Sequence, residues 1–325
     1  MTMPSSTPAW VEQLQECGYA VRKGLLDPQR DLAPLHAEYA TLLDGLARQW
    51  HATGRLRSAY EDLALEKRFA AVFSEMDPSC MQYFDISLPK FQVTEETPLH
   101  LGPAVFNLMR HPRLLDTIET FIGGEIYSNP VQHIRMKLPQ RAVAKSAPYT
   151  SLVSYTPWHQ DNGVILPEAD ESRILTVWFS LTESTVENGC MQVFPRSHRG
   201  DLVTHCPVDK GLTIADSLLP AITPTLLPMH PGSVLLMTSR TIHSSLENTT
   251  EDEVRVSFDI RYQPTGQPTG RPAFPGFVAH SSAAPQSVLS DPAAWEASWL
   301  NARAALAEQS NPTFNRWKSG VGACA

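Results

Sequence analysis

The sequence predicts a mainly β fold with flanking α-helices, in which a jelly roll (double-stranded β-helix, cupin-like) core lies between an N-terminal helical scaffold and a C-terminal helix. Three observations predict it: helical spacing in most of residues 1–125, short β-type runs within residues 126–263, and a Pro/Gly-rich connection before a last helix within residues 264–325. Many short strands separated by turn residues are typical of a sheet closed on itself. We therefore expect a single domain, residues 1–325, built from these three parts.

The N-terminal part follows the helical period. Apolar residues recur at spacings of three and four in residues 35–43 and again in residues 60–65, so we expect a helical pattern from Pro8 to about Phe73. A further helix is expected from Pro112 to about Phe121, because two glycines follow it. This half of the chain predicts a helical scaffold.

The central part contains short segments that are rich in apolar residues and bounded by Pro, Gly and Asn, as strands are. They are Val131 to Leu138, Ile174 to Leu181, Cys190 to Phe194, Ser233 to Met237 and Val254 to Tyr262. Two long stretches, residues 139–157 and 199–228, have no clear period, and such loops either form lids over active sites or pack as surface coil. The last helix is expected from about Pro292 to Glu308.

Composition and charge narrow the class of protein. A formal net charge of −8 and a pI near 5.8 disfavour nucleic acid or an anionic membrane as partner, because either would bind a basic surface. The five cysteines are scattered and form no C-x-x-C pair, which predicts neither a disulfide framework nor a zinc knuckle and favours a reducing compartment. With no signal-peptide pattern and no apolar run of membrane-spanning length, we expect a soluble, cytoplasmic protein that acts on a small-molecule substrate. No pattern indicates its oligomeric state.

One short stretch carries a metal-binding pattern. His159 and Asp161 stand two residues apart where a strand is expected to end, and residues at i and i+2 of a strand point to the same side. In this composition about one H-x-[DE] pattern is expected by chance. The other one, His36 with Glu38, lies in a helical segment where such residues diverge, so we assign it to a solvated helix surface.

His243 is the candidate for a third ligand. It follows residues 231–237, a turn that leads into an apolar strand, although a lone histidine in such a place is more often a core residue than a ligand. Two histidines and one carboxylate on one face of an octahedron leave three positions open, as in non-haem Fe(II) oxygenases.

The segment from Arg255 to Tyr262 adds cations to the predicted interior. Alternation places Arg255, Ser257, Asp259 and Arg261 on one face of the strand and its apolar residues on the other. An arginine inside a jelly roll is costly unless an anion meets it, and a dicarboxylate docked on Arg255 would supply that anion. Alternatively, either arginine pairs with a nearby acidic residue of the surface, Asp259 or Glu253.

Three patterns in this order resemble the phytanoyl-CoA dioxygenase family of Fe(II)- and 2-oxoglutarate-dependent oxygenases. They are W-H-Q-D at residues 158–161, N-G-C-M-Q-V-F-P-R-S-H at residues 188–198, and H-S-S at residues 243–245 followed by Asn248 and Arg255. The middle pattern is similar to the family's N-G-x-(L/M)-x-x-x-P-x-S-H stretch. Together the patterns cover about Val131 to Tyr262, and residues 121–124 resemble the family's entry into the barrel.

The resemblance implies a role for several residues. His159, Asp161 and His243 would bind Fe(II), and Arg255 would bind the distal carboxylate of 2-oxoglutarate. Further cosubstrate contacts are implied for Ser245, for Ser257 on the same strand face as Arg255, and, where the pattern is shifted by one residue, for Trp178 and Gln132.

The resemblance also implies the reaction class. Substrate oxidation by O₂ would be coupled to decarboxylation of 2-oxoglutarate to succinate and CO₂. Hydroxylation of an unactivated C–H bond is the expected outcome. Asp161 fills the position that halogenating relatives leave for halide, which argues for hydroxylation, desaturation or ring chemistry instead of halogenation. We rank a specialised metabolite or lipid-like compound above an acyl-CoA, since the only basic cluster for coenzyme A phosphates is formed by Arg135, Lys137, Arg141 and Lys145.

Two other interpretations compete with this one. A zinc hydrolase can use the same three ligands, but it needs a general-base carboxylate near the metal and gives Arg255 no role. A catalytically silent jelly-roll binding protein would keep the fold without the chemistry, and the presence of all three ligands together with the arginine argues against it.

Overall fold

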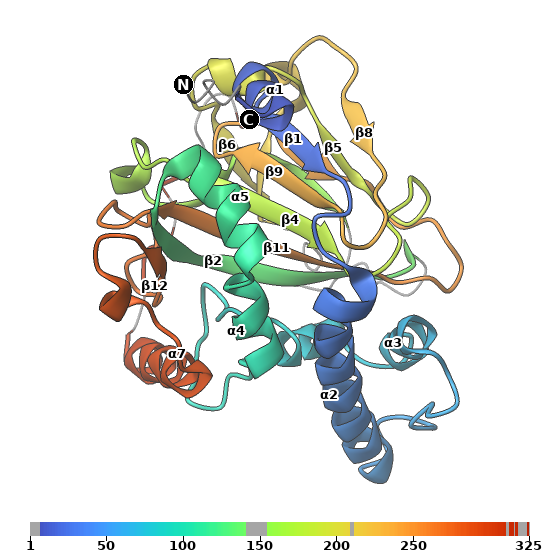
Figure 1. The fold of residues 1–325 in the computed structure, drawn as a ribbon. Coiled ribbons are helices and arrows are strands. Elements are labelled where there is room, and N and C mark those ends of the chain that lie inside the picture. The colour runs from blue at the N-terminus through green and yellow to red at the C-terminus, as the bar shows by residue number, and fades with distance from the viewer. Residues whose placement is uncertain are drawn as a thin grey trace.

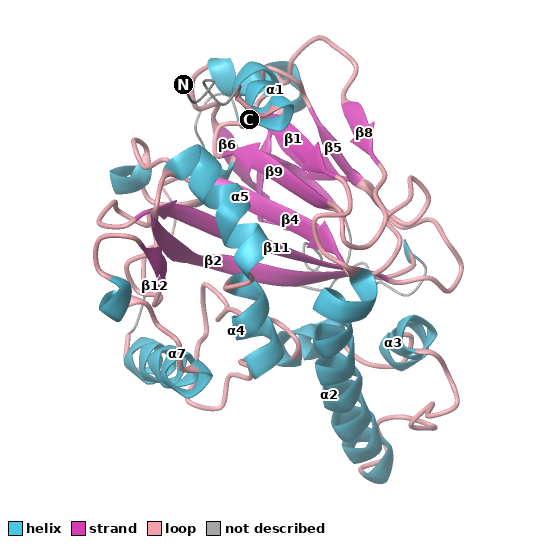
Figure 2. Cartoon of the chain, in the orientation of Figure 1, coloured by secondary structure: helices cyan, strands magenta, loops and turns pink. Residues whose placement is uncertain are grey.

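Two antiparallel sheets form a jelly roll in the computed structural model, which describes residues 7–140, 155–208, 211–309, 312–314, 316–317 and 324 (Figures 1 and 2). The six-stranded sheet has the order β1 (Tyr19–Arg22), β9 (Val234–Thr238), β4 (Leu175–Ser180), β11 (Arg255–Pro264), β2 (Glu125–Lys137) and β12 (Phe277–Ser281). The four-stranded sheet has the order β3 (Thr156–His159), β10 (His243–Ser245), β5 (Met191–Val193) and β8 (Thr225–Leu227). A separate hairpin joins β6 (His205–Val208) to β7 (Gly211–Ile214).

The helices cover the outer face of the six-stranded sheet. They are α1 (Ala9–Cys17), α2 (Ala33–Ala52), α3 (Leu65–Phe73), α4 (Pro103–Met109), α5 (Pro112–Ile122) and α7 (Pro292–Ala307). Figure 1 shows α5 lying across β2 and β11, with α4 continuing beyond it. The last helix agrees with the predicted one to within a residue, and Gly123, with φ of 94°, ends α5 where the two glycines predict it.

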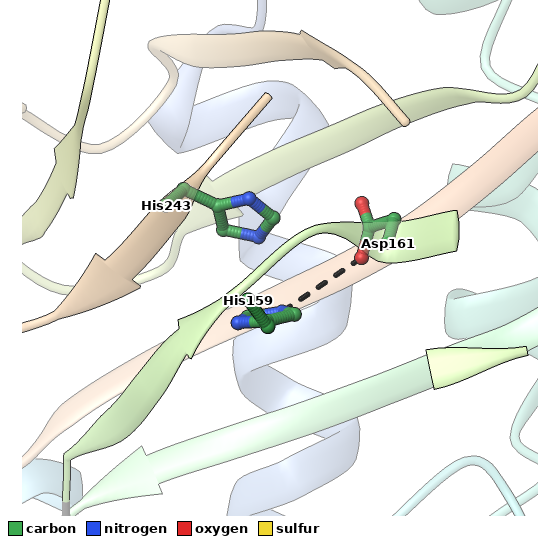
Figure 3. A group of neighbouring side chains, drawn as sticks. All are labelled: His159, Asp161 and His243. Carbon is green, nitrogen blue, oxygen red and sulfur yellow. Dashed lines mark ion pairs between the residues drawn. The ribbon is translucent and has the colours of Figure 1, made fainter. Parts of the chain in front are cut away.

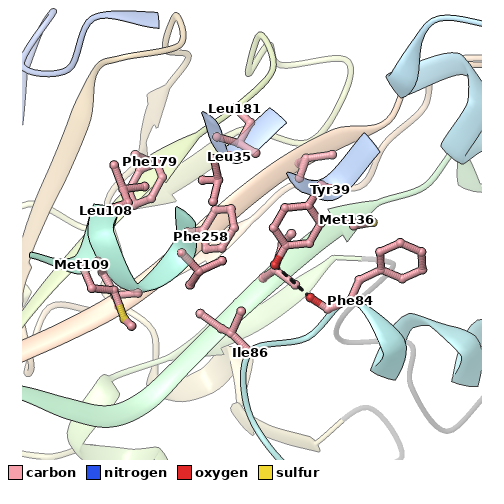
Figure 4. Packing of buried hydrophobic residues seen from close by; sticks show 14 of the residues in the cluster. Leu35, Tyr39, Phe84, Ile86, Leu108, Met109, Met136, Phe179, Leu181 and Phe258 are labelled. Atoms are coloured by element: carbon pink, nitrogen blue, oxygen red, sulfur yellow. Dashed lines mark hydrogen bonds between the residues drawn. The ribbon is translucent and has the colours of Figure 1, made fainter. Parts of the chain in front are cut away.

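The main hydrophobic core lies between these helices and the sheet. Leu35 and Tyr39 of α2 and Leu108 of α4 meet Phe179 of β4 and Phe258 of β11 (Figure 4). All five are buried, and the Tyr39 hydroxyl donates a hydrogen bond of 3.1 Å to the main-chain oxygen of Phe84. The predicted apolar face of β11 therefore packs on the helices, which leaves its polar face for the interior of the jelly roll.

A smaller core fills the space between the two sheets. It combines Tyr19 of β1, Trp178 of β4 and Leu235 of β9 with Met191 and Val193 of β5. This core occupies one end of the interior, next to the polar residues of β11 and β4.

The first strand corrects the expectation that residues 8–73 are helical. Gly18 adopts a positive φ of 83° and ends α1, and the next four residues pair with β9, Tyr19 opposite Met237 and Arg22 opposite Val234. A strand this short leaves too little alternation to stand out beside the long helical pattern, and its pairing partner lies more than 200 residues away. The N-terminal part thus contributes the edge strand β1 to the six-stranded sheet, and the C-terminal part contributes the edge strand β12.

The pattern around His36 is not a solvated helix surface. The carboxylate of Glu38 accepts hydrogen bonds from the main-chain nitrogen of Ala104 (2.7 Å) and from His100 (2.9 Å), so it caps α4. The ring of His36 contacts the main-chain oxygen of Leu181 at 3.1 Å.

Among the described residues, none of the helices is both long and apolar enough to cross a membrane.

Candidate iron and 2-oxoglutarate site

Three side chains of the kinds that bind metals meet at the end of β3 and the start of the neighbouring strand β10. His159 is the last residue of β3 and His243 the first of β10, and the antiparallel register places them opposite each other. Their ring centroids are 4.2 Å apart, and Asp161 Oδ1 lies 3.8 Å from His159 Nε2 (Figure 3). All three side chains are buried, and one ligand atom from each lies within 4.8 Å of the others. The group has the size and the donor set of a metal site.

Asp161 lies just beyond the strand rather than on it. Gln160 remains extended, with φ of −109° and ψ of 142°, and Asp161 begins the 3-10 turn Asp161–Val164. The strand alternation therefore continues for one more residue, which turns Asp161 to the side of His159. Gln160 turns away, and its amide nitrogen donates to the main-chain oxygen of Arg240 at 2.8 Å.

Main-chain carbonyls orient both imidazoles. His159 Nδ1 lies 2.8 Å from the oxygen of Pro157, and His243 Nδ1 lies 2.9 Å from the oxygen of Thr241. A carbonyl oxygen only accepts hydrogen bonds, so each Nδ1 carries the hydrogen and each Nε2 keeps its lone pair for a metal. Burial and the neighbouring His243 lower the pKa of His159 well below its ordinary value, which keeps the ring in the neutral, ligating form.

The Asp161 carboxylate is held through both oxygens. Oδ1 accepts a hydrogen bond of 2.5 Å from Arg261 Nη2, and Oδ2 accepts one from the Thr176 hydroxyl. Burial alone would raise the pKa of this carboxyl, but the charge of Arg261 and its hydrogen bond to the carboxylate lower it below its usual range. Asp161 is therefore an anion with a fixed orientation.

Arg255 points into the interior without a partner. It is fully buried, and its Nε, Nη1 and Nη2 atoms have no hydrogen-bond partner among the described residues. Its guanidinium carbon lies 5.2 Å from the centroid of the Trp178 ring, and burial lowers its pKa to about 9. Ser257 Oγ and Trp178 Nε1 are also buried without a partner. These orphaned donors fit the distal carboxylate of 2-oxoglutarate, which would satisfy them.

The remaining predicted cosubstrate contacts are already bonded within the protein. Ser245 Oγ accepts a 2.9 Å hydrogen bond from the main-chain nitrogen of Thr156, although its own proton remains available. Gln132 Nε2 donates to the main-chain oxygen of Ile86 at 2.9 Å. Strand alternation places Gln132 with Ile134, which packs in the helix-covered core, so the structure does not group it with Arg255.

The N-G…S-H stretch shapes turns instead of supplying ligands. Asn188 Oδ1 accepts from the main-chain nitrogen of Thr185 at 2.8 Å. Gly189 has φ of 92°, and a Cβ there would lie 2.7 Å from the main-chain oxygen of Leu246, so only glycine fits. This close approach holds β5 beside β10, which carries His243.

The C-terminal segment, which the sequence left without a role, packs against the turn that carries Asp161. Arg316 forms a two-pronged ion pair of 2.6 Å with Asp170 and donates to the main-chain oxygen of Asn162 at 3.1 Å. Trp317 donates to the main-chain oxygen of Gly163 at 2.5 Å and stacks on His205, with ring centroids 5.4 Å apart.

The predicted loop from residue 139 to 157 lies mostly outside the described residues.

One disulfide corrects the prediction from cysteine spacing. Cys206 on β6 is joined to Cys324, although 118 positions separate them. Cys17, Cys80 and Cys190 are free. Spacing rules detect local pairs such as C-x-x-C, whereas this bond depends on the C-terminal segment folding back over the jelly roll.

Comparison with known proteins places the chain in a family. A family model described as phytanoyl-CoA dioxygenase (PhyH) matches residues 14–257. The chain belongs to the phytanoyl-CoA dioxygenase family. This member is thus a non-haem iron dioxygenase that uses Fe(II), 2-oxoglutarate and O₂, and the His159, Asp161 and His243 group is its candidate iron site.

Two curated relatives are similar to this dioxygenase over long stretches. A probable phytanoyl-CoA dioxygenase of Caenorhabditis elegans is 25% identical over 251 residues, which are 70% of this chain and 76% of the relative. A probable alpha-ketoglutarate-dependent hypophosphite dioxygenase of Stutzerimonas stutzeri is 28% identical over 160 residues, 47% of this chain and 51% of that protein.

Solved structures share its fold. The non-heme monooxygenase ThoJ, in its apo form, superposes with a TM-score of 0.53 at 18% identity, over 92% of this chain and 97% of its own. The epimerase SnoN in complex with Fe3+, alpha ketoglutarate and nogalamycin RO superposes with a TM-score of 0.51 at 20% identity, over 82% and 88% of the two chains. The predicted jelly roll with flanking helices is confirmed.

Proposed function

We propose that this dioxygenase hydroxylates an unactivated C–H bond of a small organic molecule, a specialised metabolite or lipid-like compound, with release of succinate and CO₂. His159, Asp161 and His243 hold the iron in this proposal, and Arg255 holds the distal carboxylate of 2-oxoglutarate. The proposal depends on the site of this chain itself, since the similarity to the epimerase SnoN and to the non-heme monooxygenase ThoJ concerns the fold.

The single observation that carries the proposal is the unpartnered guanidinium of Arg255. A buried cation without an anion is costly, and a structural arginine would have found a partner. A dicarboxylate that ligates a metal at one end and reaches Arg255 at the other satisfies both parts of the site. A zinc hydrolase would leave Arg255 without a function.

The residues of the chain position and protect the reacting groups. The Pro157 and Thr241 carbonyls fix the two imidazoles, and Arg261 and Thr176 fix the Asp161 carboxylate, so the three ligands need not reorganise when a metal binds. Burial of all three side chains limits the access of water. Iron with 2-oxoglutarate and O₂ supplies the oxidising power when bound.

Turnover without a known substrate gives a direct test. Purified protein with added Fe(II), 2-oxoglutarate and O₂ should form succinate, and a screen of candidate substrates by mass spectrometry should find one that gains an oxygen atom. His159→Ala and Asp161→Ala should each abolish succinate formation, because each removes a ligand, while circular dichroism shows that the fold remains.

His230→Ala is the matched control, since His230 is exposed and the hydrogen bond of its ring is to the Glu183 side chain, neither residue being assigned to the site. It should form succinate as the unmodified protein does. Retained succinate formation in His159→Ala, or none in the iron-loaded unmodified protein, would overturn the proposal.

A further inference from the structure

The turn that carries Asp161 is held by side chains from the C-terminal part of the chain. Asp161–Val164 is a 3-10 turn of four residues, and a turn this short leaves its last main-chain oxygens without partners of its own. Four successive oxygens accept hydrogen bonds from side chains instead: Asn162 from Arg316 Nη2 (3.1 Å), Gly163 from Trp317 Nε1 (2.5 Å), Val164 from Arg271 Nη2 (2.7 Å) and Ile165 from Arg316 Nε (3.3 Å). All three donor residues lie more than a hundred positions after the turn.

Arg316 is itself fixed in place by an ion pair. Its Nη1 and Nη2 each lie 2.6 Å from an oxygen of the Asp170 carboxylate, and only 14% of its side chain is exposed. The same guanidinium donates to two main-chain oxygens of the turn region. A planar group that is bonded at both edges restricts the positions of the groups that it bonds.

His205, at the start of β6, supports the residue between the two ligands of this segment. Its Nδ1 lies 2.8 Å from the main-chain oxygen of Val203 and therefore carries the hydrogen, so Nε2 accepts the main-chain N–H of Gln160 at 2.9 Å. Burial lowers the pKa of His205 to about 4, which keeps the ring neutral and Nε2 able to accept. A Cβ on Gly163 would lie 2.1 Å from this ring, so the turn packs directly on it.

Trp317 and the disulfide join the C-terminal segment to the same place. The Trp317 ring stacks on that of His205, with centroids 5.4 Å and planes 22° apart. Cys206, the residue after His205, is bonded to Cys324. The disulfide thus fastens the segment that contains Arg316 and Trp317 one residue away from the imidazole that holds Gln160.

Asp161 is the ligand that needs such support. His159 and His243 belong to strands that are paired with each other, so the sheet fixes their main chain. Asp161 belongs to no strand, and the hydrogen bonds from Arg261 and Thr176 hold its carboxylate rather than its main chain. The course of the main chain at Asp161 therefore depends on the segments that pack around its turn.

We infer that Arg316, Trp317 and Cys324 form a clamp that holds the Asp161 turn in the geometry for binding iron, and that the Cys206–Cys324 disulfide keeps this clamp in place. Arg316 and Trp317 are then positioning residues, because they act on the metal through the turn. The affinity for iron consequently depends on the redox state of the disulfide, since ligands that are less well oriented bind a metal more weakly. The inference rests on the proposed function for the identity of the metal.

The change of redox state is a thiol–disulfide exchange with a dithiol reductant. The S–S bond between Cys206 and Cys324 breaks, and each sulfur gains one electron and one proton. The dithiol supplies both electrons and both protons and becomes a disulfide. The clamp then keeps its hydrogen bonds to the turn but loses the covalent bond that fastens it.

Fe(II) affinity, measured without turnover, tests the clamp. Fe(II) would be titrated calorimetrically under nitrogen into the oxidised protein and its variants. Arg316→Met should weaken Fe(II) binding about tenfold or more, the usual result of removing a group that orients metal ligands. Arg316→Lys should recover part of the affinity, because a lysine still pairs with Asp170. Trp317→Phe keeps a ring to stack on His205 but loses the donor, so it should weaken binding severalfold.

Arg303→Met is the matched control. Arg303 also lies in the C-terminal part, but its Nη1 donates to the main-chain oxygen of Thr97 at 3.1 Å instead of to the turn. The substitution removes the same charge, so it should leave Fe(II) affinity unchanged even where it lowers the melting temperature. Equal Fe(II) affinities of Arg316→Met and Arg303→Met would overturn the clamp. Should Arg316→Met not fold, Arg316→Lys and Trp317→Phe give the same comparison with Arg303→Met.

Reduction tests the part of the inference that concerns the disulfide. Free-thiol titration of the denatured protein should find three thiols before treatment with dithiothreitol and five after it. Protein that is reduced and then freed of the reagent under nitrogen should bind Fe(II) severalfold more weakly than the oxidised protein, and trypsin should cleave it faster after Arg316.

Cys324→Ser separates this disulfide from the other cysteines. The variant should bind Fe(II) as the reduced protein does, and dithiothreitol treatment should not weaken its binding further. Equal Fe(II) affinity of the oxidised and reduced proteins would overturn the role of the disulfide, as would an equal loss of affinity on reduction of Cys324→Ser.

The two proposals fail separately. Succinate formation, together with an Fe(II) affinity that neither Arg316→Met nor reduction changes, would remove the clamp and leave the oxygenase function. Fe(II) binding that depends on Arg316 and on the disulfide, without succinate formation, would remove the oxygenase function and leave the clamp.

Discussion

Two arginines on the same face of β11 behave in opposite ways. Arg261 donates to the main-chain oxygen of Val131 at 2.7 Å, to Asp259 at 3.1 Å and to Asp161 at 2.5 Å. The guanidinium of Arg255, six positions earlier, donates to no described residue. Burial lowers the pKa of Arg255 to about 9, whereas at Arg261 the charges of Asp161 and Asp259 outweigh burial and raise the pKa above its ordinary value. At one end of the strand both terminal nitrogens of the guanidinium are bonded within the protein, although Nε has no partner among the described residues, and at the other end no guanidinium nitrogen is bonded.

The difference separates two uses of a buried charge. An arginine with its carboxylates in place contributes to the folded structure, and removing it leaves those carboxylates exposed to an apolar interior. An arginine without an anion costs stability in the free protein and recovers that cost when a ligand binds. Stability and ligand affinity should therefore respond in opposite ways to substitutions at the two positions.

Replacing Arg261 should have the largest effect on stability. Arg261→Met leaves the buried carboxylate of Asp161 with only the Thr176 hydroxyl, so we expect the free energy of unfolding to fall by about 3–5 kcal/mol. Urea unfolding followed by circular dichroism measures it. Added Fe(II) should restore part of the loss, because the metal supplies a positive charge to Asp161. Arg261→Met with unchanged stability would show that the ion pairs of Arg261 are not structural.

Replacing Arg255 should instead affect the cosubstrate. Arg255→Met removes an unpartnered buried charge, so the stability of the ligand-free protein should stay the same or increase, while affinity for 2-oxoglutarate falls about a hundredfold with the loss of a two-pronged ion pair. Calorimetric titration of 2-oxoglutarate into the metal-loaded protein under nitrogen measures the affinity. Arg255→Lys is the matched variant, and it should bind with intermediate affinity because it keeps the charge but loses the planar fork. Unchanged affinity in Arg255→Met would remove Arg255 as the anchor.

The sequence predicted the parts of the site that follow strand alternation. His159 and Asp161 two residues apart, and the polar face of residues 255–261, are local patterns that the fold preserves. The fold class followed from the same alternation together with the helical spacing before it. His243 could be predicted as a third ligand because its strand, β10, begins a short turn after the recognisable apolar strand β9.

The parts that the sequence did not predict depend on contacts between distant segments. Asp259 lies on the same strand face as both arginines, so the sequence left it open which of them it pairs with; Asp161, which also binds Arg261, comes from a segment a hundred residues earlier. The disulfide of Cys206 with Cys324 joins the C-terminal segment to β6, and the contacts of Arg316 join it to the region of the Asp161 turn, in both cases over more than a hundred residues.

The hydroxyl groups of Thr176 and Ser257 differ in the same way as Arg261 and Arg255, but replacing them should change stability and affinity less. Thr176 donates to the Asp161 carboxylate at the satisfied end of the site, whereas Ser257 Oγ is buried without a partner near the Arg255 end. Thr176→Val keeps the shape and leaves a charged acceptor unsatisfied, so we expect a loss of about 1.5 kcal/mol in the free energy of unfolding. Ser257→Ala removes a donor that bonds nothing in the free protein, so its stability should change by less than about 0.5 kcal/mol while affinity for 2-oxoglutarate falls severalfold. Urea unfolding and calorimetric titration of the two variants side by side measure both quantities. An equal loss of stability in both would mean that the Ser257 hydroxyl is structural, and the division between a satisfied and a ligand-ready end of β11 would then apply to the arginines alone.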